Sequence, residues 1–104
     1  MSIQRARSVE EYVDFVQQAL YELEELRVAA EYNLEDLGTS LGFVNELEAG
    51  VRQLYRSMEE GSYRFENKDL PFMDIVERYD TDALPFRHLL RQINETHRLG
   101  LDAE

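Results

Sequence analysis

The segment that decides the fold, residues 8–61, reads SVEEYVDFVQQALYELEELRVAAEYNLEDLGTSLGFVNELEAGVRQLYRSMEEG. Its apolar residues recur in steps of seven, and further apolar residues fill the positions between them. The recurring positions are Val9, Val16, Leu23, Ala30 and Leu37. Since an α-helix turns by about 100° per residue, these positions form one apolar stripe. The stripe predicts a long amphipathic helix over residues 9–37.

Capping residues mark the ends of this helix, and a second helix follows it. Ser8 and Glu11 have the spacing of a capping box, and Gly38 is placed to end the first helix. A second apolar pattern with three- and four-residue spacing predicts a helix over residues 40–60, which Gly61 ends. Because only a short turn separates the two helices, they should be antiparallel neighbours. Residues 8–61 are therefore predicted to form a helical hairpin.

The second half of the chain contains a short sequence that nearly repeats itself. Leu70-Pro71-Phe72 and Leu84-Pro85-Phe86 are each followed by three apolar residues at helical spacing. An Asp stands shortly before each copy, at positions 69 and 82, where it could cap a helix whose first turn tolerates Pro. We therefore expect a connecting loop over residues 62–69. Two shorter C-terminal helices should follow within residues 70–104, at about 70–79 and 83–99.

The composition supports a folded domain and excludes several kinds of protein. Of the 104 residues, 43% are hydrophobic, and 22 acidic residues outnumber 11 Lys and Arg residues, for a formal net charge of -11. Such an excess of acid disfavours contact with nucleic acid and with anionic membrane surfaces. The sequence has no Cys and no apolar signal or membrane segment, so we expect a cytoplasmic location. We predict one all-α domain over residues 1–104, with a frayed N-terminus at residues 1–7.

The length of the first helix points to a partner. A helix over residues 9–37 would be about 43 Å long, whereas a compact chain of this size has a diameter of about 33 Å. The helix would therefore extend beyond a compact monomer. In addition, Tyr21, Val28 and Tyr32 lie together on the acidic back of this helix, opposite the apolar stripe. Either the C-terminal helices or a second subunit should cover them. We favour a homodimer, in which two hairpins form a four-helix-bundle-like core.

Few residues are candidates for chemistry. No catalytic, cofactor-binding or nucleotide-binding motif is present, and neither His has a Glu three residues before it, as a helical di-metal site would require. The acidic residues of the first helix are expected to form a solvated face. His97 shares the apolar face of the last helix, so we regard it as a candidate ligand or interface residue. Phe72, Tyr79 and Phe86 are aromatic candidates for core or interface positions.

Three functions are compatible with these features. The leading hypothesis is a small, acidic, non-catalytic helical module that self-associates and binds a further, unidentified protein. The alternative is a protein that binds a small molecule or a metal ion through the aromatic C-terminal half and His97. The third is a nucleic-acid mimic, in which the acidic face occupies a basic groove on another protein.

Overall fold

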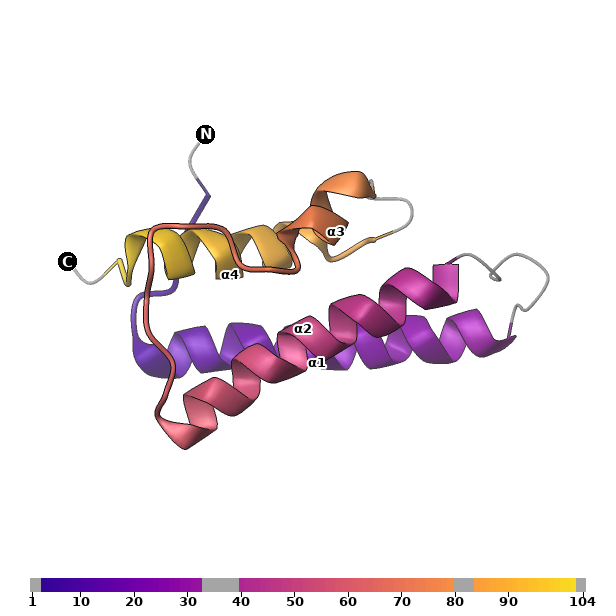
Figure 1. Cartoon of the computed structure of the whole chain (residues 1–104), viewed down its shortest axis with the longest axis horizontal. Helices are drawn as coiled ribbons and strands as arrows, with labels where there is room; N and C mark the ends of the chain where they lie inside the picture. The colour runs from indigo at the N-terminus through magenta and orange to yellow at the C-terminus, as the bar shows by residue number, and fades with distance from the viewer. Residues whose placement is uncertain (1–2, 33–39, 80–83, 103–104) are drawn as a thin grey trace.

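The computed structural model describes residues 3–32, 40–79 and 84–102, which form four helices and no strand. These helices are α1 (Val9–Tyr32), α2 (Ser40–Glu60), α3 (Met73–Arg78) and α4 (Arg87–Leu99). The helices α1 and α2 lie against each other as a long pair, and α3 and α4 cover one face of that pair (Figure 1). The predicted all-α fold and the long helix pair are therefore confirmed. The predicted continuation of the first helix to Leu37 and its end at Gly38 lie outside the described residues.

The apolar stripe of α1 faces the core, as its spacing predicts. Val16, Ala19 and Leu23 are fully buried, and they belong to the same core cluster as the apolar residues of α2. Those α2 residues are Phe43, Val44, Leu47, Val51 and Leu54. The first residue of the stripe differs from the prediction, because Val9 is 62% exposed. It lies at the very start of α1, on the rim of a hollow between α1 and the segment after α2.

A side-chain cap stabilises the start of α1. The backbone N–H of Glu11 donates to the Ser8 hydroxyl over 3.1 Å, which confirms Ser8 as the predicted N-cap. The Glu11 carboxylate accepts from the backbone N–H of Arg7 over 3.2 Å, one residue earlier than a standard capping box would have it. The first contact satisfies an N–H group that a helix start would otherwise leave without a partner, and the second ties the preceding residue to the first turn.

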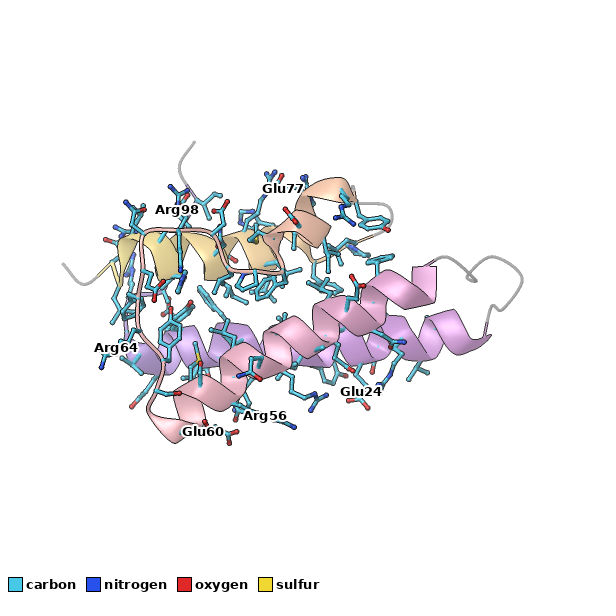
Figure 2. The ribbon with its side chains drawn as sticks, in the orientation of Figure 1. Glu24, Arg56, Glu60, Arg64, Glu77 and Arg98 are labelled. Atoms are coloured by element: carbon cyan, nitrogen blue, oxygen red, sulfur yellow. The ribbon has the colours of Figure 1, made fainter. Side chains whose placement is uncertain are left out.

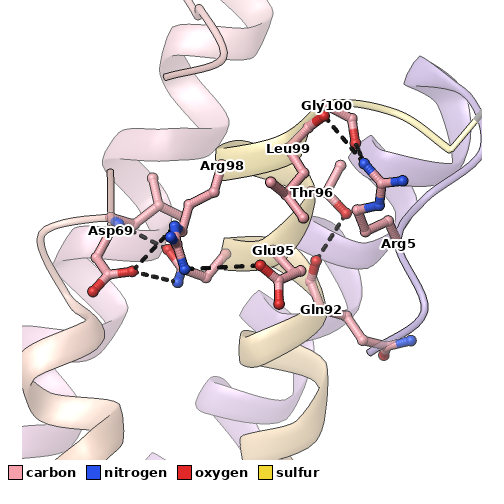
Figure 3. A network of polar contacts seen from close by, with 10 residues as sticks. Arg5, Asp69, Gln92, Glu95, Thr96, Arg98, Leu99 and Gly100 are labelled. Atoms are coloured by element: carbon pink, nitrogen blue, oxygen red, sulfur yellow. Dashed lines mark hydrogen bonds and ion pairs between the residues drawn. The ribbon is translucent and has the colours of Figure 1, made fainter. Parts of the chain in front are cut away.

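The segment before α1 is not frayed at residues 3–7, in contrast to the prediction. Ala6 is fully buried, and its N–H donates to the Thr96 hydroxyl over 3.0 Å. Its carbonyl accepts from the N–H of Asp102 over 2.8 Å, and the Arg5 guanidinium donates to the carbonyls of Leu99 and Gly100 (Figure 3). The end of α4 thus binds the start of the chain, because its last carbonyls lack helical donors.

The two Leu-Pro-Phe sequences form the same turn. In each copy the Leu carbonyl accepts from the residue three positions on, with distances of 3.0 Å at Leu70 and 3.1 Å at Leu84. In each copy the Leu is buried and the Phe occupies the N-cap position of the following helix without a side-chain cap. Asp69 therefore does not cap α3 as predicted, since the turn begins one residue after it and supplies the capping contacts from the backbone. Asp82 lies outside the described residues.

Gly50 and Phe43 connect α2 to the C-terminal half. A Cβ placed on Gly50 would lie 3.0 Å from the Cβ of Phe72, so the close approach of this turn to α2 favours a residue without a side chain. At the start of α2, the Phe43 ring stacks on the Tyr79 ring with centroids 3.9 Å apart. These two contacts hold the turn and the end of α3 against α2.

Candidate binding site at the C-terminal half of α4

Three buried polar residues of α4 each hold a different segment without regular structure. Thr96 binds the N-terminal segment, as described above. The Asn94 side-chain oxygen accepts from the N–H of Leu70 over 2.8 Å, and its amide donates to the Asp69 carboxylate over 3.0 Å. Arg98 reaches the same carboxylate over 3.8 Å, and also approaches Glu95 (Figure 3). The loop before α3 is therefore fixed to α4 by side chains and does not rest on apolar packing alone.

The third residue, His97, completes a chain of hydrogen bonds that crosses the core. The Tyr12 hydroxyl donates to the Ile93 carbonyl over 3.1 Å, and it lies 3.0 Å from the Tyr63 hydroxyl. The Tyr63 hydroxyl lies in turn 2.7 Å from Nδ1 of His97. The backbone carbonyl of His97 also accepts from the N–H of Glu66 over 3.2 Å. Residues 63–66 are thus attached to α4 at two points.

Counting protons in this chain assigns the tautomer of His97. The Ile93 carbonyl only accepts, so the one Tyr12 proton is used there. The Tyr63 proton must then be donated to the Tyr12 oxygen, and the contact between Tyr63 and His97 needs a proton on Nδ1. This arrangement satisfies all three contacts and leaves a lone pair on Nε2 of the neutral ring. Nε2 makes no hydrogen bond to any other described residue.

Burial disfavours the charged forms of the three side chains in this network. It lowers the pKa of His97, an effect that Glu66 opposes and Lys68 reinforces. It raises the pKa of Tyr63 to about 12, and it raises the pKa of Tyr12 further. In both Tyr residues, loss of hydration disfavours the phenolate.

The lowered pKa of His97 predicts a loss of stability in mild acid. Below its ordinary pKa of about 6.5, the unfolded chain binds a proton more readily than the folded chain does. Stability contributed by neutral His97 is therefore complete above that pH and is lost as the pH falls toward the folded-state pKa. We expect thermal melts from pH 7.5 to 5 to show a decrease in the wild type that His97→Gln reduces. The exposed His88 provides the control, so His88→Gln should keep the wild-type pH dependence, and equal pH dependence in all three proteins would contradict the assignment.

An open pocket adjoins this network. It has a volume of about 540 Å³, and it lies between α2 and the segment Ser62–Phe72, with His97 contributing from α4. Its apolar walls include Leu54, Leu70 and Phe72. Gly50 and Phe72, which approach each other closely, both line the pocket. His97 is only 6% exposed, and it is one of the residues that line the pocket.

The aromatic candidates in the C-terminal half lie within the chain's own core. Phe72 is 3% exposed and Phe86 is also buried, while Tyr79 is half-buried against Phe43. The structure does not bring these three side chains together with Tyr21 or Val28, because α3 and α4 lie on the face of the hairpin to which the apolar stripe of α1 points.

Tyr21 and Val28 remain on the surface. Tyr21 is 61% exposed and Val28 is 44% exposed, so the C-terminal helices do not cover them. Tyr32 is the last residue of α1, but its side chain lies outside what the structure describes. The outer side of the hairpin also carries charged residues, such as Glu24 and Glu60, which point away from α4 (Figure 2).

The acidic face of α1 is largely exposed, but Arg27 makes ion pairs that the sequence did not reveal, one of them with Glu24. Glu10, Asp14 and Glu25 are exposed. Arg27, however, crosses the hairpin to the buried Glu48 of α2, with a distance of 3.0 Å between guanidinium and carboxylate. Across residues 3–32, 40–79 and 84–102, no three His, Asp or Glu side chains are grouped closely enough to hold a metal ion.

Sequence reasoning identified His97 but missed the residues that act with it. The hydrogen bonds of Tyr63, Asn94 and Thr96 join residues that are 24 to 90 positions apart in the sequence. No local spacing therefore relates these residues to their partners. The sequence held one signal for these contacts, which is the cluster of polar residues that follows Ile93 in α4. In the structure Asn94, Thr96 and His97 of this cluster are buried.

In the described parts of the chain, no helix combines the length and the hydrophobicity that crossing a bilayer would need. Comparison with protein-family models, with curated proteins and with solved structures finds no match to this chain.

Proposed function

We propose that the protein is a non-catalytic helical interaction module that self-associates through the outer face of α1 and acts in the cytoplasm. The observation that supports this most is the exposure of Tyr21 and Val28. They are seven residues apart, so they lie on one side of the helix, two turns or about 10 Å from each other. Tyr is enriched at protein interfaces because its ring adds apolar area while its hydroxyl keeps a polar contact.

A second copy of the chain is the occupant that the architecture favours. The helices α3 and α4 already cover one face of the hairpin, so another molecule would have to approach from the side that they leave open. Two hairpins related by a twofold axis, the commonest symmetry of soluble oligomers, would place both α1 helices together in a four-helix arrangement. A further, unidentified protein would then bind the assembled dimer.

The charge around this face predicts how self-association depends on salt. Asp14 and Glu25 flank Tyr21 and Val28 on the same side of α1, and both are exposed. Two copies of such a face repel each other, and added salt screens that repulsion within a Debye length of about 8 Å at physiological ionic strength. The homodimer should therefore become tighter as sodium chloride is raised, whereas binding to a basic partner would weaken.

Sedimentation equilibrium over a range of protein concentrations tests this proposal. The wild type should form a dimer that tightens between low and high salt, and Tyr21→Glu with Val28→Glu should be monomeric with an unchanged helix content. The matched control is Asn45→Glu with Gln53→Glu, which also adds two carboxylates, but at exposed positions of α2. A monomeric wild type at all concentrations would contradict the proposal, and so would equal dissociation of the two double variants.

A further inference from the structure

We propose that the pocket between α2 and the Ser62–Phe72 segment binds a small, uncharged molecule with an apolar body and one O–H or N–H donor. Its volume of about 540 Å³ lies within the range of about 300 to 1,000 Å³ typical of small-molecule sites. Leu54, Leu70 and Phe72 supply apolar walls from two different segments. No residue of α1 lines it, so this inference is independent of the self-association proposed above.

The polar group that selects the ligand is Nε2 of His97. The Nδ1 proton is used by Tyr63, and no described residue donates to Nε2. Nε2 is not among the fully buried polar atoms, so solvent reaches it, and a ligand that displaces this solvent must offer a donor in its place. The ligand should therefore bring a hydroxyl or an N–H group to the inner part of the pocket, while its apolar portion contacts Leu54 and Phe72.

The charges at the mouth of the pocket indicate a neutral ligand. Arg64 and Lys68 contribute two cations, and Glu66 and Asp69 contribute two carboxylates. Lys68 pairs with Glu66 over 3.0 Å, and Asp69 is held by Asn94 and by Arg98. The lining therefore has no net charge, and its carboxylates are already engaged. A metal ion alone is disfavoured, because His97 is the only imidazole in the lining and no group of three ligating side chains surrounds it among residues 3–32, 40–79 and 84–102.

Phenol and anisole provide a matched pair of probes. Both have the same ring, but only phenol has the hydroxyl proton that Nε2 can accept. We expect phenol, titrated at pH 7.5 and followed by nuclear magnetic resonance, to shift the Nε2 resonance of His97. It should also shift the backbone amides of residues 62–72. Anisole should bind at least about tenfold more weakly, because it would displace solvent from the Nε2 lone pair without offering a donor.

Two variants separate this site from the rest of the surface. Gln53 is an exposed residue of α2 that lines the pocket, so Gln53→Trp should fill the mouth and weaken phenol binding about tenfold or more. Asn45 is exposed on the same helix but does not line the pocket, so Asn45→Trp should bind phenol like the wild type. Equal affinities for phenol and anisole would overturn the proposal. Phenol binding that Gln53→Trp leaves unchanged, or shifts confined to the outer face of α1, would do the same.

Discussion

Replacing Leu23 with Asp should cost about 4 kcal/mol or more in the free energy of unfolding, enough to abolish cooperative folding in a domain of ordinary stability. Leu23 is 0% exposed, and it lies in the middle of the stripe where α1 packs on α2. A carboxylate there would lose its hydration. Arg27, one turn further on, already pairs with Glu24 and Glu48, so it is not free to compensate the new charge. Circular dichroism during thermal and urea denaturation measures the effect.

Ala29 provides the control for this substitution. It is an exposed residue of the same helix, and Ala29→Asp introduces the same carboxylate in solvent. Its cost should be below about 1 kcal/mol, most of it from the lower helix propensity of Asp and its position near the end of α1. If the two substitutions destabilised the protein equally, the orientation of α1 about its axis would be wrong.

Phe72→Ala should destabilise the folded chain by about 3 to 5 kcal/mol. The Phe72 ring is 3% exposed and fills the space beside Gly50, which has no side chain to replace it. The turn that contains Phe72 is attached to α4 through Leu70 and Asn94, which limits how far the cavity can collapse. Urea denaturation, with the midpoint and the slope fitted separately, measures this loss.

Tyr21→Ala is the comparison that separates core from surface among the aromatic candidates. At a protein concentration low enough for a monomer, it should change the free energy of unfolding by less than about 1 kcal/mol, because Tyr21 is 61% exposed. At higher concentration it should weaken self-association instead. A small effect of Phe72→Ala together with a large effect of Tyr21→Ala in the monomer would contradict the structure.

The hairpin could be predicted from the sequence because its signals are local. The stripe through Val16 and Leu23 repeats over several turns, and a periodic pattern of that length has one structural interpretation. The Ser8 cap likewise depends on residues three positions apart. By contrast, α3 has only six residues, fewer than two helical turns, so its sequence pattern is too short to define its bounds.

The contacts that complete the fold depend on partners far away in the sequence. Ala6 looks like an ordinary residue of a terminal segment, yet it is buried because Thr96 and Asp102 bind its backbone. Asp69 has the position of a helix cap, but Asn94 and Arg98 hold it instead. Such contacts follow from how the helices are arranged, so the sequence indicated His97 as a polar residue on an apolar face without identifying Tyr63 as its partner.

The most direct test of the proposed self-association is an isotope-filtered nuclear Overhauser experiment on a mixture of labelled and unlabelled protein at high salt. This measurement detects only contacts between different copies of the chain. We predict intermolecular signals from the Tyr21 ring and the Val28 methyl groups, which are exposed on the outer face of α1. The absence of intermolecular signals, or their restriction to other exposed residues such as Phe65 and Leu99, would contradict the account.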